Sequence, residues 1–476
     1  MTEVFAARRI SSLITILASM VLIVGTRIAI AQTPAAPQAQ VTTDQSTQPM
    51  GTPVAPNASA PVIAQPATPP TATPSDSIPP GTTITMQNWQ QFQQYMPDGM
   101  AALFEGKYFW KMPADVKMEV GPTIIRPLPK TYMEATEKYS GQVKLVELPD
   151  GALTLSGYQG GMPFPNPAEP HQGWKVLANV WYRYLPHLIV DSYGNGCSID
   201  RTGSITCEAA QIVNRQLAFN TDPNTPVNYD GAGEKFSSEW LMVLEPEQQR
   251  YTAQLTLSYQ DLAKPQDGYV FLPSLRRYQP VSSAARCSPN QGTDSTQEDY
   301  RFGFNSNLTE LKVDVIAEKK VLALVDSTLP LGDFPKNFDM PLAWPMPSWG
   351  KWQLRDVFEI SVSKIPSKAA GYCYGKRVMY VDKATYAPVW EDLYDSKMQP
   401  WRYFGMFMQT VDVPGVGPVT ANGAMVWAFW DVQNSHATFF IDPAPGHAFY
   451  VNEQAPSEYL DLTRYSSAPG LNQIMR

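Results

Sequence analysis

Alternation of apolar and polar residues marks a strand in the C-terminal half of the chain. Over residues 352–362 the side chains alternate between two faces. The apolar face consists of Leu354, Phe358, Ile360 and Val362. A period of two over this length is typical of a half-buried strand in an antiparallel sheet. A hairpin is predicted upstream, where residues 251–259 alternate, 264–268 turn the chain and 269–273 return.

The segments 376–382, 388–394 and 400–407 form the clearest meander in the sequence. The turns between them are too short for a crossover helix, so neighbouring strands must run antiparallel. Two later segments, 424–430 and 437–441, are apolar on both faces. Such strands pack on the core with one face, and on a second apolar layer or a ligand with the other.

Helical patterns are sparse. The sequence indicates one helix over residues 88–100, with Asn88 as a possible cap, and a last turn or two near the C-terminus. We therefore predict an α+β fold that is mainly antiparallel β-sheet.

The N-terminus has the features of a cleavable signal peptide. Arg8 and Arg9 precede an apolar stretch over residues 10–25, and small residues end at Ala31, where cleavage is expected. The alternative is an uncleaved membrane anchor, but these 16 apolar residues fall short of the roughly 20 that span a bilayer. The protein is therefore expected to be exported, to the periplasm of a bacterium.

Residues 32–80 are dominated by Pro, Ala, Thr, Ser and Gln. Such a segment cannot bury enough apolar surface to offset the entropy lost on ordering. We interpret it as a disordered tether, so the chain divides into a signal peptide (1–31), a tether (32–80) and a β-rich domain (81–476).

The charge of the chain argues against a nucleic-acid partner. The full sequence has 36 basic and 44 acidic residues. Without Arg8, Arg9, Arg27 and Glu3 of the signal peptide the counts are 33 and 43, a net charge near −10. Nucleic-acid binding and polybasic membrane binding both require an excess of positive charge.

The four cysteines suit an oxidising compartment. Residues 197–207 fold symmetrically about Thr202, with a three-residue loop that ends on Gly203. Directly opposed residues of an antiparallel pair are close enough for a disulfide. This register predicts a Cys197–Cys207 disulfide and leaves Cys287 to pair with Cys373. Metal ligation is the alternative, but the sequence contains no CxxC spacing.

Four blocks of residues resemble the exported family catalogued as domain of unknown function 1329, over roughly residues 85–460. They are Pro129, Tyr132, Ala135 and Thr136; then 160–165 with Gly173, Lys175, Val176, Asn179, Tyr182, Arg183 and Tyr184; then Leu275, Arg276 and Arg277 with Gly332, Asp333 and Phe334; and Arg355, Asp356 and Val357 with Lys376, Arg377, Val378, Tyr380, Val381 and Asp382.

This resemblance implies a fold similar to the lipoprotein-localisation (LolA/LolB-like) carriers. In that fold an incomplete, half-open β-barrel wraps over a few helices and encloses an apolar cavity. The resemblance supplies no catalytic residues and no cofactor, and we expect neither an enzyme nor a metal site.

The chain contains few groups with the spacing that catalysis needs. Acidic neighbours such as Glu391–Asp392 and Glu298–Asp299 would point to opposite faces of a strand, so we interpret them as solvated turn residues. The basic pairs Arg276–Arg277 and Lys319–Lys320 could meet an anionic group, although ordinary ion pairing is the simpler interpretation.

Aromatic residues are the most suggestive signal for a ligand. The cavity candidates are Phe358, Tyr380, Trp390, Trp427 and Phe429. An apolar-lined open barrel binds hydrophobic molecules without covalent chemistry. The alternative is that these side chains only fill the core.

Two functions follow from these features. The first is a periplasmic binding or carrier protein for a lipid-like molecule, serving an envelope exporter or an outer-membrane component. The alternative is a non-enzymatic scaffold in a cell-envelope complex, whose edge strands extend another protein's sheet. A hydrolase is a distant third.

Overall fold

The computed structural model describes residues 77–290, 292–327, 334–419 and 425–475. The predicted signal peptide and nearly all of the predicted tether lie outside the described residues. The described residues all belong to one compact unit, Thr73–Arg476.

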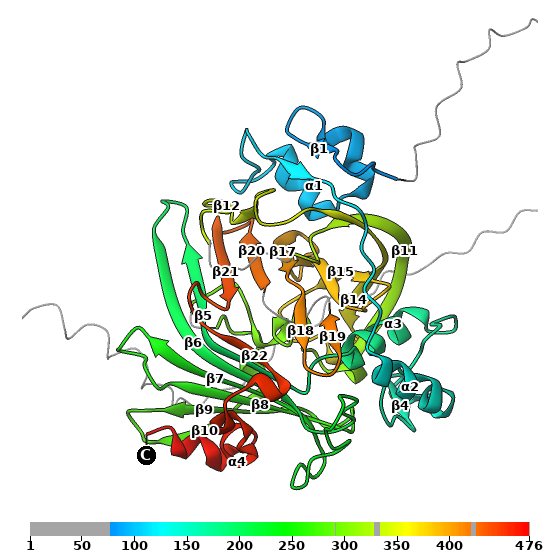
Figure 1. Cartoon of the computed structure of the whole chain (residues 1–476), viewed down its shortest axis with the longest axis vertical. Coiled ribbons are helices and arrows are strands. Elements are labelled where there is room, and N and C mark those ends of the chain that lie inside the picture. Colours follow the sequence, from blue (N-terminus) through cyan, green and yellow to red (C-terminus); the bar gives the residue numbers. More distant parts are fainter. Residues whose placement is uncertain (1–76, 291, 328–333, 420–424, 476) are drawn as a thin grey trace, which may run out of the picture. The chain divides into compact units, whose positions relative to one another are not determined.

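One antiparallel sheet of 14 strands dominates this unit (Figure 1). Its order is β10-β9-β8-β7-β6-β5-β21-β20-β17-β16-β15-β14-β11, with β22 paired to β5. The strands of this sheet are β5 (Leu188–Ile199), β6 (Ile205–Gln216), β7 (Lys235–Glu245), β8 (Ala253–Tyr259), β9 (Asp267–Leu272), β10 (Arg277–Val281), β11 (Leu311–Ala323), β14 (Gln353–Lys364), β15 (Lys376–Asp382), β16 (Pro388–Tyr394), β17 (Pro400–Met408), β20 (Met425–Asp431), β21 (His436–Asp442) and β22 (Phe449–Val451).

Four short two-stranded pairs accompany the sheet. They are β1 (Thr83–Ile84) with β2 (Met118–Glu119), β3 (Lys144–Glu147) with β4 (Leu153–Ser156), β12 (Phe338–Asp339) with β13 (Trp344–Pro345), and β18 (Val411–Val413) with β19 (Gly417–Val419).

The strand predictions are confirmed. The expected hairpin is β8 with β9, and the expected meander is β15, β16 and β17, all in antiparallel pairs. The two strands that are apolar on both faces, β20 and β21, lie in the middle of the sheet. Both faces of these strands are covered, which explains why their sequences do not alternate.

The large sheet is curved but does not close into a barrel. Gln297 donates a hydrogen bond to Thr256 of β8 at 2.8 Å, whereas Asp299, two residues later, accepts one from Arg377 of β15 at 2.6 Å. β8 and β15 are eight steps apart in the strand order, roughly 38 Å in a flat sheet. The sheet must therefore curl around these two residues. Its end strands β10 and β11 do not pair with each other, so the incomplete antiparallel barrel predicted from the sequence is confirmed.

The predicted helix over residues 88–100 is wrong as a single element. Residues Trp89–Tyr95 form the 3₁₀ helix η1, and α1 (Asp98–Glu105) begins after Pro97. Met96 is extended, because the residue before a proline is pushed out of the helical region. The other helices are α2 (Lys130–Tyr139), α3 (Gln172–Tyr182), α4 (Leu462–Tyr465), η2 (Ser140–Gln142), η3 (Ser283–Cys287), η4 (Gln297–Asp299), η5 (Leu308–Glu310), η7 (Pro366–Lys368), η8 (Asn452–Gln454), η9 (Ser457–Leu460) and η10 (Ala468–Gln473).

Helix α3 escaped prediction because it is buried almost all round. Nine of its eleven residues are buried, so its sequence lacks the polar stripe that makes a surface helix recognisable. No helix in the described part of the chain is long and apolar enough to cross a membrane.

The two faces of the sheet are covered by different elements. We call the face that contacts residues 293–308 the inner face, and α3 also packs there, against β11 and β14. On the outer face, α1 meets β16, and Trp344 packs with Trp390 and Trp430. The C-terminal α4 and η10 cover the outer face of β7 and β8 (Figure 1).

Both disulfides are present in the expected pairs. Cys197 lies directly opposite Cys207 in the β5–β6 ladder, with their Cα atoms 4.1 Å apart. Gly203 ends the connecting turn with φ +83°, the left-handed conformation that this turn requires. The second disulfide joins Cys287 and Cys373, which are 86 residues apart in the sequence.

Candidate functional site

The connection between β10 and β11 enters the curved sheet. We call residues 293–308 of this connection the plug. On one side of the sheet Gln297 reaches Thr256 of β8, and in the middle Asp294 pairs with His436 of β21 at 2.7 Å. The plug also meets α3, where Trp174 donates to the carbonyl of Leu308 at 3.2 Å. The plug therefore fills part of the space inside the curved sheet.

A buried ionic cluster anchors the plug to the far half of the sheet. Arg377 of β15 donates to Asp299 of the plug at 2.6 Å and to Glu391 of β16 at 2.5 Å. Its side chain is 2% exposed, and both carboxylates are 0% exposed. Burial alone would lower the pKa of Arg377, but the two carboxylates hold it above its usual value. Burial raises the pKa of Glu391 to about 8.

The tip of the plug has an unusual backbone. Arg301, Phe302 and Gly303 are consecutive residues with φ of +53°, +58° and +103°. Left-handed torsions are unfavourable for residues with a Cβ, and surrounding contacts must hold them. Arg183 donates to the carbonyls of Arg301 and Phe302 at 3.2 and 3.1 Å, and Arg301 donates to the carbonyl of Trp181 at 2.8 Å.

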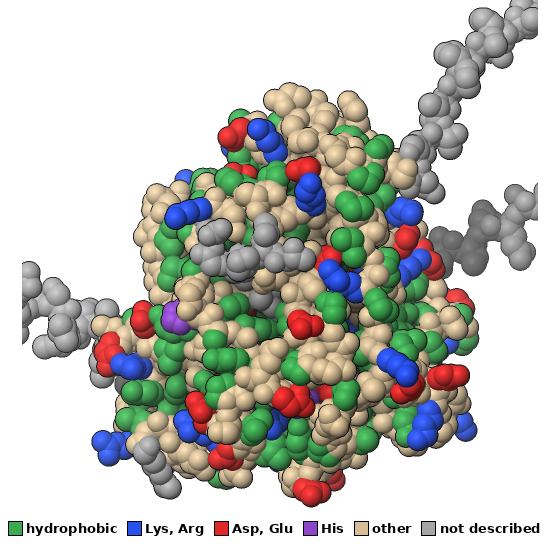
Figure 2. Space-filling view, viewed as in Figure 1, with side chains coloured by type: hydrophobic (Ala, Val, Ile, Leu, Met, Phe, Trp, Pro, Cys, Tyr) green, Lys and Arg blue, Asp and Glu red, His purple; other side chains and the backbone are tan. Residues whose placement is uncertain are grey.

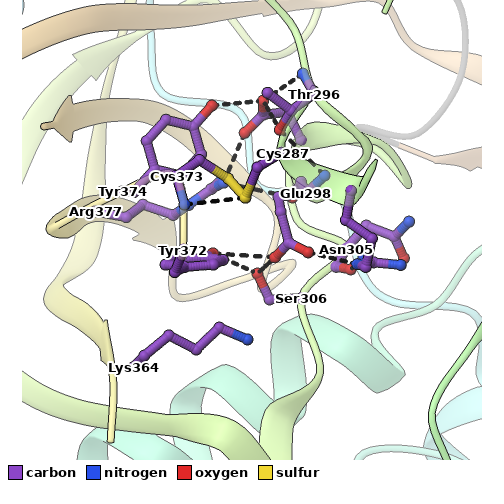
Figure 3. The surroundings of a disulfide bond; sticks show 12 residues. Cys287, Thr296, Glu298, Asn305, Ser306, Lys364, Tyr372, Cys373, Tyr374 and Arg377 are labelled. Carbon is purple, nitrogen blue, oxygen red and sulfur yellow. Dashed lines mark hydrogen bonds and ion pairs between the residues drawn. A yellow bond between two sulfur atoms is a disulfide. The ribbon is translucent and has the colours of Figure 1, made fainter. Parts of the chain in front are cut away.

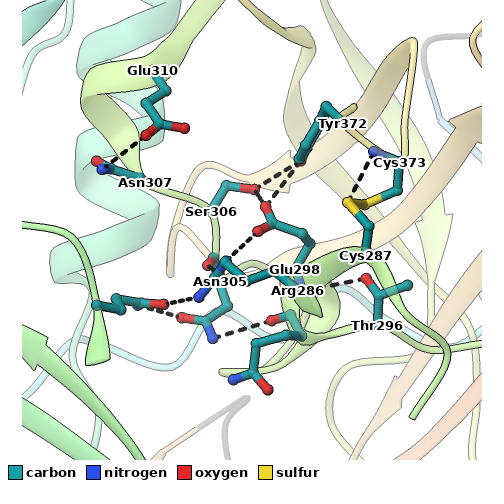
Figure 4. A network of polar contacts seen from close by, with 12 residues as sticks. Arg286, Cys287, Thr296, Glu298, Asn305, Ser306, Asn307, Glu310, Tyr372 and Cys373 are labelled. Atoms are coloured by element: carbon teal, nitrogen blue, oxygen red, sulfur yellow. Dashed lines mark hydrogen bonds and ion pairs between the residues drawn. A yellow bond between two sulfur atoms is a disulfide. The ribbon is translucent and has the colours of Figure 1, made fainter. Parts of the chain in front are cut away.

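The base of the plug is held by the second disulfide and a polar network. Figure 3 shows Cys287, just before the plug, bonded to Cys373 in the loop before β15. Beside it, Glu298 accepts hydrogen bonds from Arg286 at 2.6 Å and from Tyr372 at 3.0 Å, as well as from Ser306 (Figure 4). Burial would raise the pKa of Glu298, but Arg286 and Lys364 hold it below its usual value.

Between the plug and strands β5 to β8 the inner face keeps a cavity of about 100 Å³. Most of its walls are apolar or aromatic: Ile189, Ile212, Trp240, Leu241, Tyr300, Phe302, Trp427, Phe440 and Phe449. A neighbouring cavity of about 280 Å³ shares Gln254 and Thr256 as walls. Pockets for drug-sized ligands measure roughly 300–1,000 Å³. A lipid-sized molecule therefore requires these spaces to merge or the plug to move.

Three carboxyl groups lie in the wall of the smaller cavity. They come from Asp191 of β5, Glu239 of β7 and Asp442 of β21. Asp191 and Asp442 meet at Gly194, where a Cβ would lie 2.5 Å from an oxygen of each. Burial raises the pKa of Asp442 to about 6 and of Asp191 to about 9. The charge of Asp442 and a hydrogen bond between the two carboxyl groups raise the pKa of Asp191 further, whereas the same hydrogen bond lowers that of Asp442. Burial also raises the pKa of Glu239 to about 7.

We expect the free energy of unfolding to fall as the pH rises from 6 to 9. Both aspartates have pKa values above the value of about 3.9 that they have in the unfolded chain. The folded state thus keeps a proton that the unfolded state has released, and stability is lost as pH rises through the folded pKa. One retained proton gives a slope of up to about 1.4 kcal/mol per pH unit. Denaturant unfolding at pH 6, 7, 8 and 9 measures this slope.

Asp191→Asn should make that slope shallower, because the amide does not titrate; Glu239 and Glu391, with pKa values of about 7 and 8, keep the remainder. Asp200→Asn is the matched control, since Asp200 lies in the exposed turn after β5 and hydrogen bonds from Thr202 and Ser204 lower its pKa. The control should keep the wild-type slope. Equal slopes for wild type and Asp191→Asn would show that the pair does not share a proton.

The structure places the five aromatic cavity candidates in different parts of the molecule. Trp427 lines the cavity. Phe429, on the same side of β20, stacks on Phe404 with ring centroids 3.9 Å apart, and Phe358 is buried with α3 in the inner core. Tyr380 and Trp390 belong to the outer-face core: the Tyr380 hydroxyl accepts from the backbone of Asp98, and Trp390 stacks on Trp430.

The basic candidates lie at the two edges of the sheet. Arg276 precedes β10 and Arg277 begins it, at one edge of the sheet, and both are exposed. Lys319 and Lys320 form ion pairs with Glu359 and Asp356, which is the simpler interpretation given above. On the face shown in Figure 2 acidic and basic side chains are interspersed.

The interpretation of the acidic neighbours as solvated turn residues is wrong. Glu391, Asp392, Glu298 and Asp299 are all buried, with exposures of 0, 1, 2 and 0%. Glu391 and Asp299 share Arg377, while Asp392 accepts from the indole of Trp390 at 2.8 Å. The partners come from distant parts of the chain, so local sequence did not reveal them. The apolar context of residues 388–394 was the one available signal.

Comparison with known proteins gives a family match. The family model described as "Protein of unknown function (DUF1329)" matches residues 83–463. Comparison with curated proteins finds no match.

Three solved structures resemble the chain at low identity. A DUF1329 family protein from Desulfovibrio piger is 13% identical, with a TM-score of 0.42, over 62% of this chain and 98% of that one. A putative outer membrane lipoprotein-sorting protein domain from Vibrio parahaemolyticus is 13% identical, with a TM-score of 0.41, over 60% and 95%. A LolA superfamily protein from Nitrosomonas europaea is 10% identical, with a TM-score of 0.35, over 61% and 97%. Because these identities and TM-scores are low, we infer the function from the cavity and not from these structures.

Proposed function

We propose that this chain, which belongs to the DUF1329 family of proteins of unknown function, is a non-enzymatic carrier that holds a hydrophobic molecule inside its curved sheet. The observation that supports the proposal is the apolar cavity between the plug and β5 to β8, which adjoins a larger one. A core that served only to stabilise the fold would contain few voids of this size.

The two disulfides also favour a location outside the cytoplasm. Disulfides persist in oxidising compartments, and all four cysteines are paired. We place the protein in the periplasm, where a carrier would pass its ligand to or from an envelope exporter or an outer-membrane component. The ligand is held by burial of its apolar surface, at about 25 cal/mol per Å².

The scaffold alternative has less support. Strand addition needs an exposed sheet edge, and proteins protect such edges with charges. The edge strand β11 exposes Lys312, Asp314 and Glu318 along its length. The other edge strand, β10, contains Pro280, which cannot donate to a ladder.

Filling the cavity should abolish ligand uptake. Ile212→Phe adds bulk to the cavity wall, whereas Ile205→Phe makes the same change at an exposed position of the same strand, 53% exposed. We expect wild type and Ile205→Phe to bind the neutral apolar dye 1-N-phenylnaphthylamine, and Ile212→Phe to bind it at least tenfold more weakly. Fluorescence titration measures this difference. Dye binding that is equal in all three proteins would place the ligand elsewhere.

Native mass spectrometry of protein purified from its own envelope tests the function directly. A carrier should retain a hydrophobic molecule that organic solvent releases. A stable protein partner and no small molecule, together with no dye uptake, would favour the scaffold.

A further inference from the structure

The apolar cavity contains more carboxyl groups than a simple hydrophobic pocket needs. Asp191, Glu239 and Asp442 reach its wall from three different strands. A buried carboxyl group without a hydrogen-bond donor costs stability, on the order of 1–3 kcal/mol. A carboxyl oxygen left without a donor at this cavity therefore calls for a ligand or a structural partner.

Their partners within the protein are incomplete. Asp191 is 2% exposed; its Oδ1 accepts from the backbone of Tyr193 at 3.0 Å, and its carboxyl group shares a hydrogen bond with that of Asp442. The buried Oε1 of Glu239 has no donor among the described residues. Asp299 of the plug is different, because Arg377, Tyr374 and Thr296 all donate to it. The Glu239 acceptor at the cavity is thus available to a ligand.

Gly194 helps to bring the acidic pair together. A side chain at this position would lie 2.5 Å from Asp191 Oδ2 and from Asp442 Oδ1. Only glycine leaves room for both carboxyl groups at this point of β5. The two groups are held next to each other, close enough for the hydrogen bond between them.

One positive group, Arg301, also lines the cavity. Its guanidinium donates to the carbonyl of Trp181 and lies 4.1 Å from the centre of that indole ring. Arg301 is therefore engaged with α3, and three carboxyl groups face it across the same space. An anionic head group would meet more negative than positive charge here.

We propose that the cavity receives an amphipathic ligand through a terminal hydrogen-bond donor, an amine or a hydroxyl, bound among Asp191, Glu239 and Asp442. The apolar body of the ligand then lies against Trp427, Phe440 and Leu241. A carboxylate or phosphate end is disfavoured at pH 8, where Glu239 and Asp442 are ionised and outnumber Arg301. This inference rests on the proposed carrier function and names the class of its ligand.

Three probes with the same chain and different ends test the proposal. Octylamine, octanol and octanoate are each titrated against bound 1-N-phenylnaphthylamine, in wild type and in Glu239→Gln and Asp191→Asn. We expect octylamine or octanol to displace the dye at least tenfold more effectively than octanoate. Preference for the amine identifies a cationic ligand, and preference for the alcohol identifies a neutral one.

The variants connect the preference to the carboxyl groups. Glu239→Gln and Asp191→Asn should each weaken the preferred probe about tenfold, the effect of about 1.4 kcal/mol, after displacement is corrected for the dye affinity measured in the same variant. Asp200→Asn, in the exposed β5–β6 turn, should change neither the probe affinity nor the dye affinity. Circular dichroism and the unfolding midpoint verify that the variants are folded.

The possible failures can be distinguished. If the dye binds but octanoate competes as well as the other probes, or the variants keep the wild-type preference, the donor site is refuted and the carrier function stands. If neither the wild type nor a variant without the Cys287–Cys373 disulfide binds any probe, the carrier function fails, and this inference with it.

Discussion

Replacing Arg377 by Met should lower the free energy of unfolding by about 3–5 kcal/mol, the usual effect of removing one partner from a buried ionic group. The guanidinium pairs with Asp299 of the plug and Glu391 of β16, which are both 0% exposed. Methionine fills much of the space but leaves two carboxyl groups buried without their cation. Urea unfolding followed by tryptophan fluorescence measures the loss.

Arg277→Met is the matched control for this substitution. Arg277 is exposed in the edge strand β10, and surface substitutions usually change stability by less than about 0.5 kcal/mol. Combining Arg377→Met with Asp299→Asn and Glu391→Gln should recover part of the loss, because the uncompensated charges are removed. A loss for Arg377→Met below about 1 kcal/mol would contradict the anchoring role of the cluster.

Removing the Cys287–Cys373 disulfide should release the plug and increase dye uptake several-fold. This disulfide fastens the base of the plug to the loop before β15. The double variant Cys287→Ser/Cys373→Ser keeps the ionic cluster, so the fold is retained while the plug opens more often. Dye titration and hydrogen exchange over residues 293–308 measure the two consequences.

The other disulfide is the control. Cys197→Ser/Cys207→Ser removes a bond between two strands that already pair. Chain entropy predicts a stabilisation of about 4.6 kcal/mol for the separation of 86 residues and about 2.7 kcal/mol for that of 10. The control should therefore lose less stability and show wild-type dye uptake. Equal dye uptake by both double variants would mean that the disulfide does not control the plug.

The sequence alone determined several of the strands and their local pairing. The meander β15–β17, the β8–β9 hairpin and the Cys197–Cys207 register were all predicted correctly. These features depend on residues close in sequence, because side-chain alternation and short turns set both direction and register. The family resemblance, carried by residues in several of these segments, is likewise confirmed by the match over 83–463.

The placement of the aromatic candidates required the tertiary structure. Tyr380 and Trp427 both lie in strongly apolar strands, yet one belongs to the outer-face core and the other lines the cavity. Alternation separates the two faces of a strand, but it does not say which face is concave. A strand that is apolar on both faces removes even that distinction.

Only the tertiary structure decided the roles of the charged residues. Asp299 is 78 residues from Arg377 in sequence, and Asp191 is more than 200 residues from Asp442, yet each pair meets inside the sheet. Whether a carboxylate is solvated, paired with a cation or open to a ligand depends on what the fold brings beside it. Local sequence carries no record of those distant partners, so the buried cluster and the acidic cavity could be found only in the folded chain.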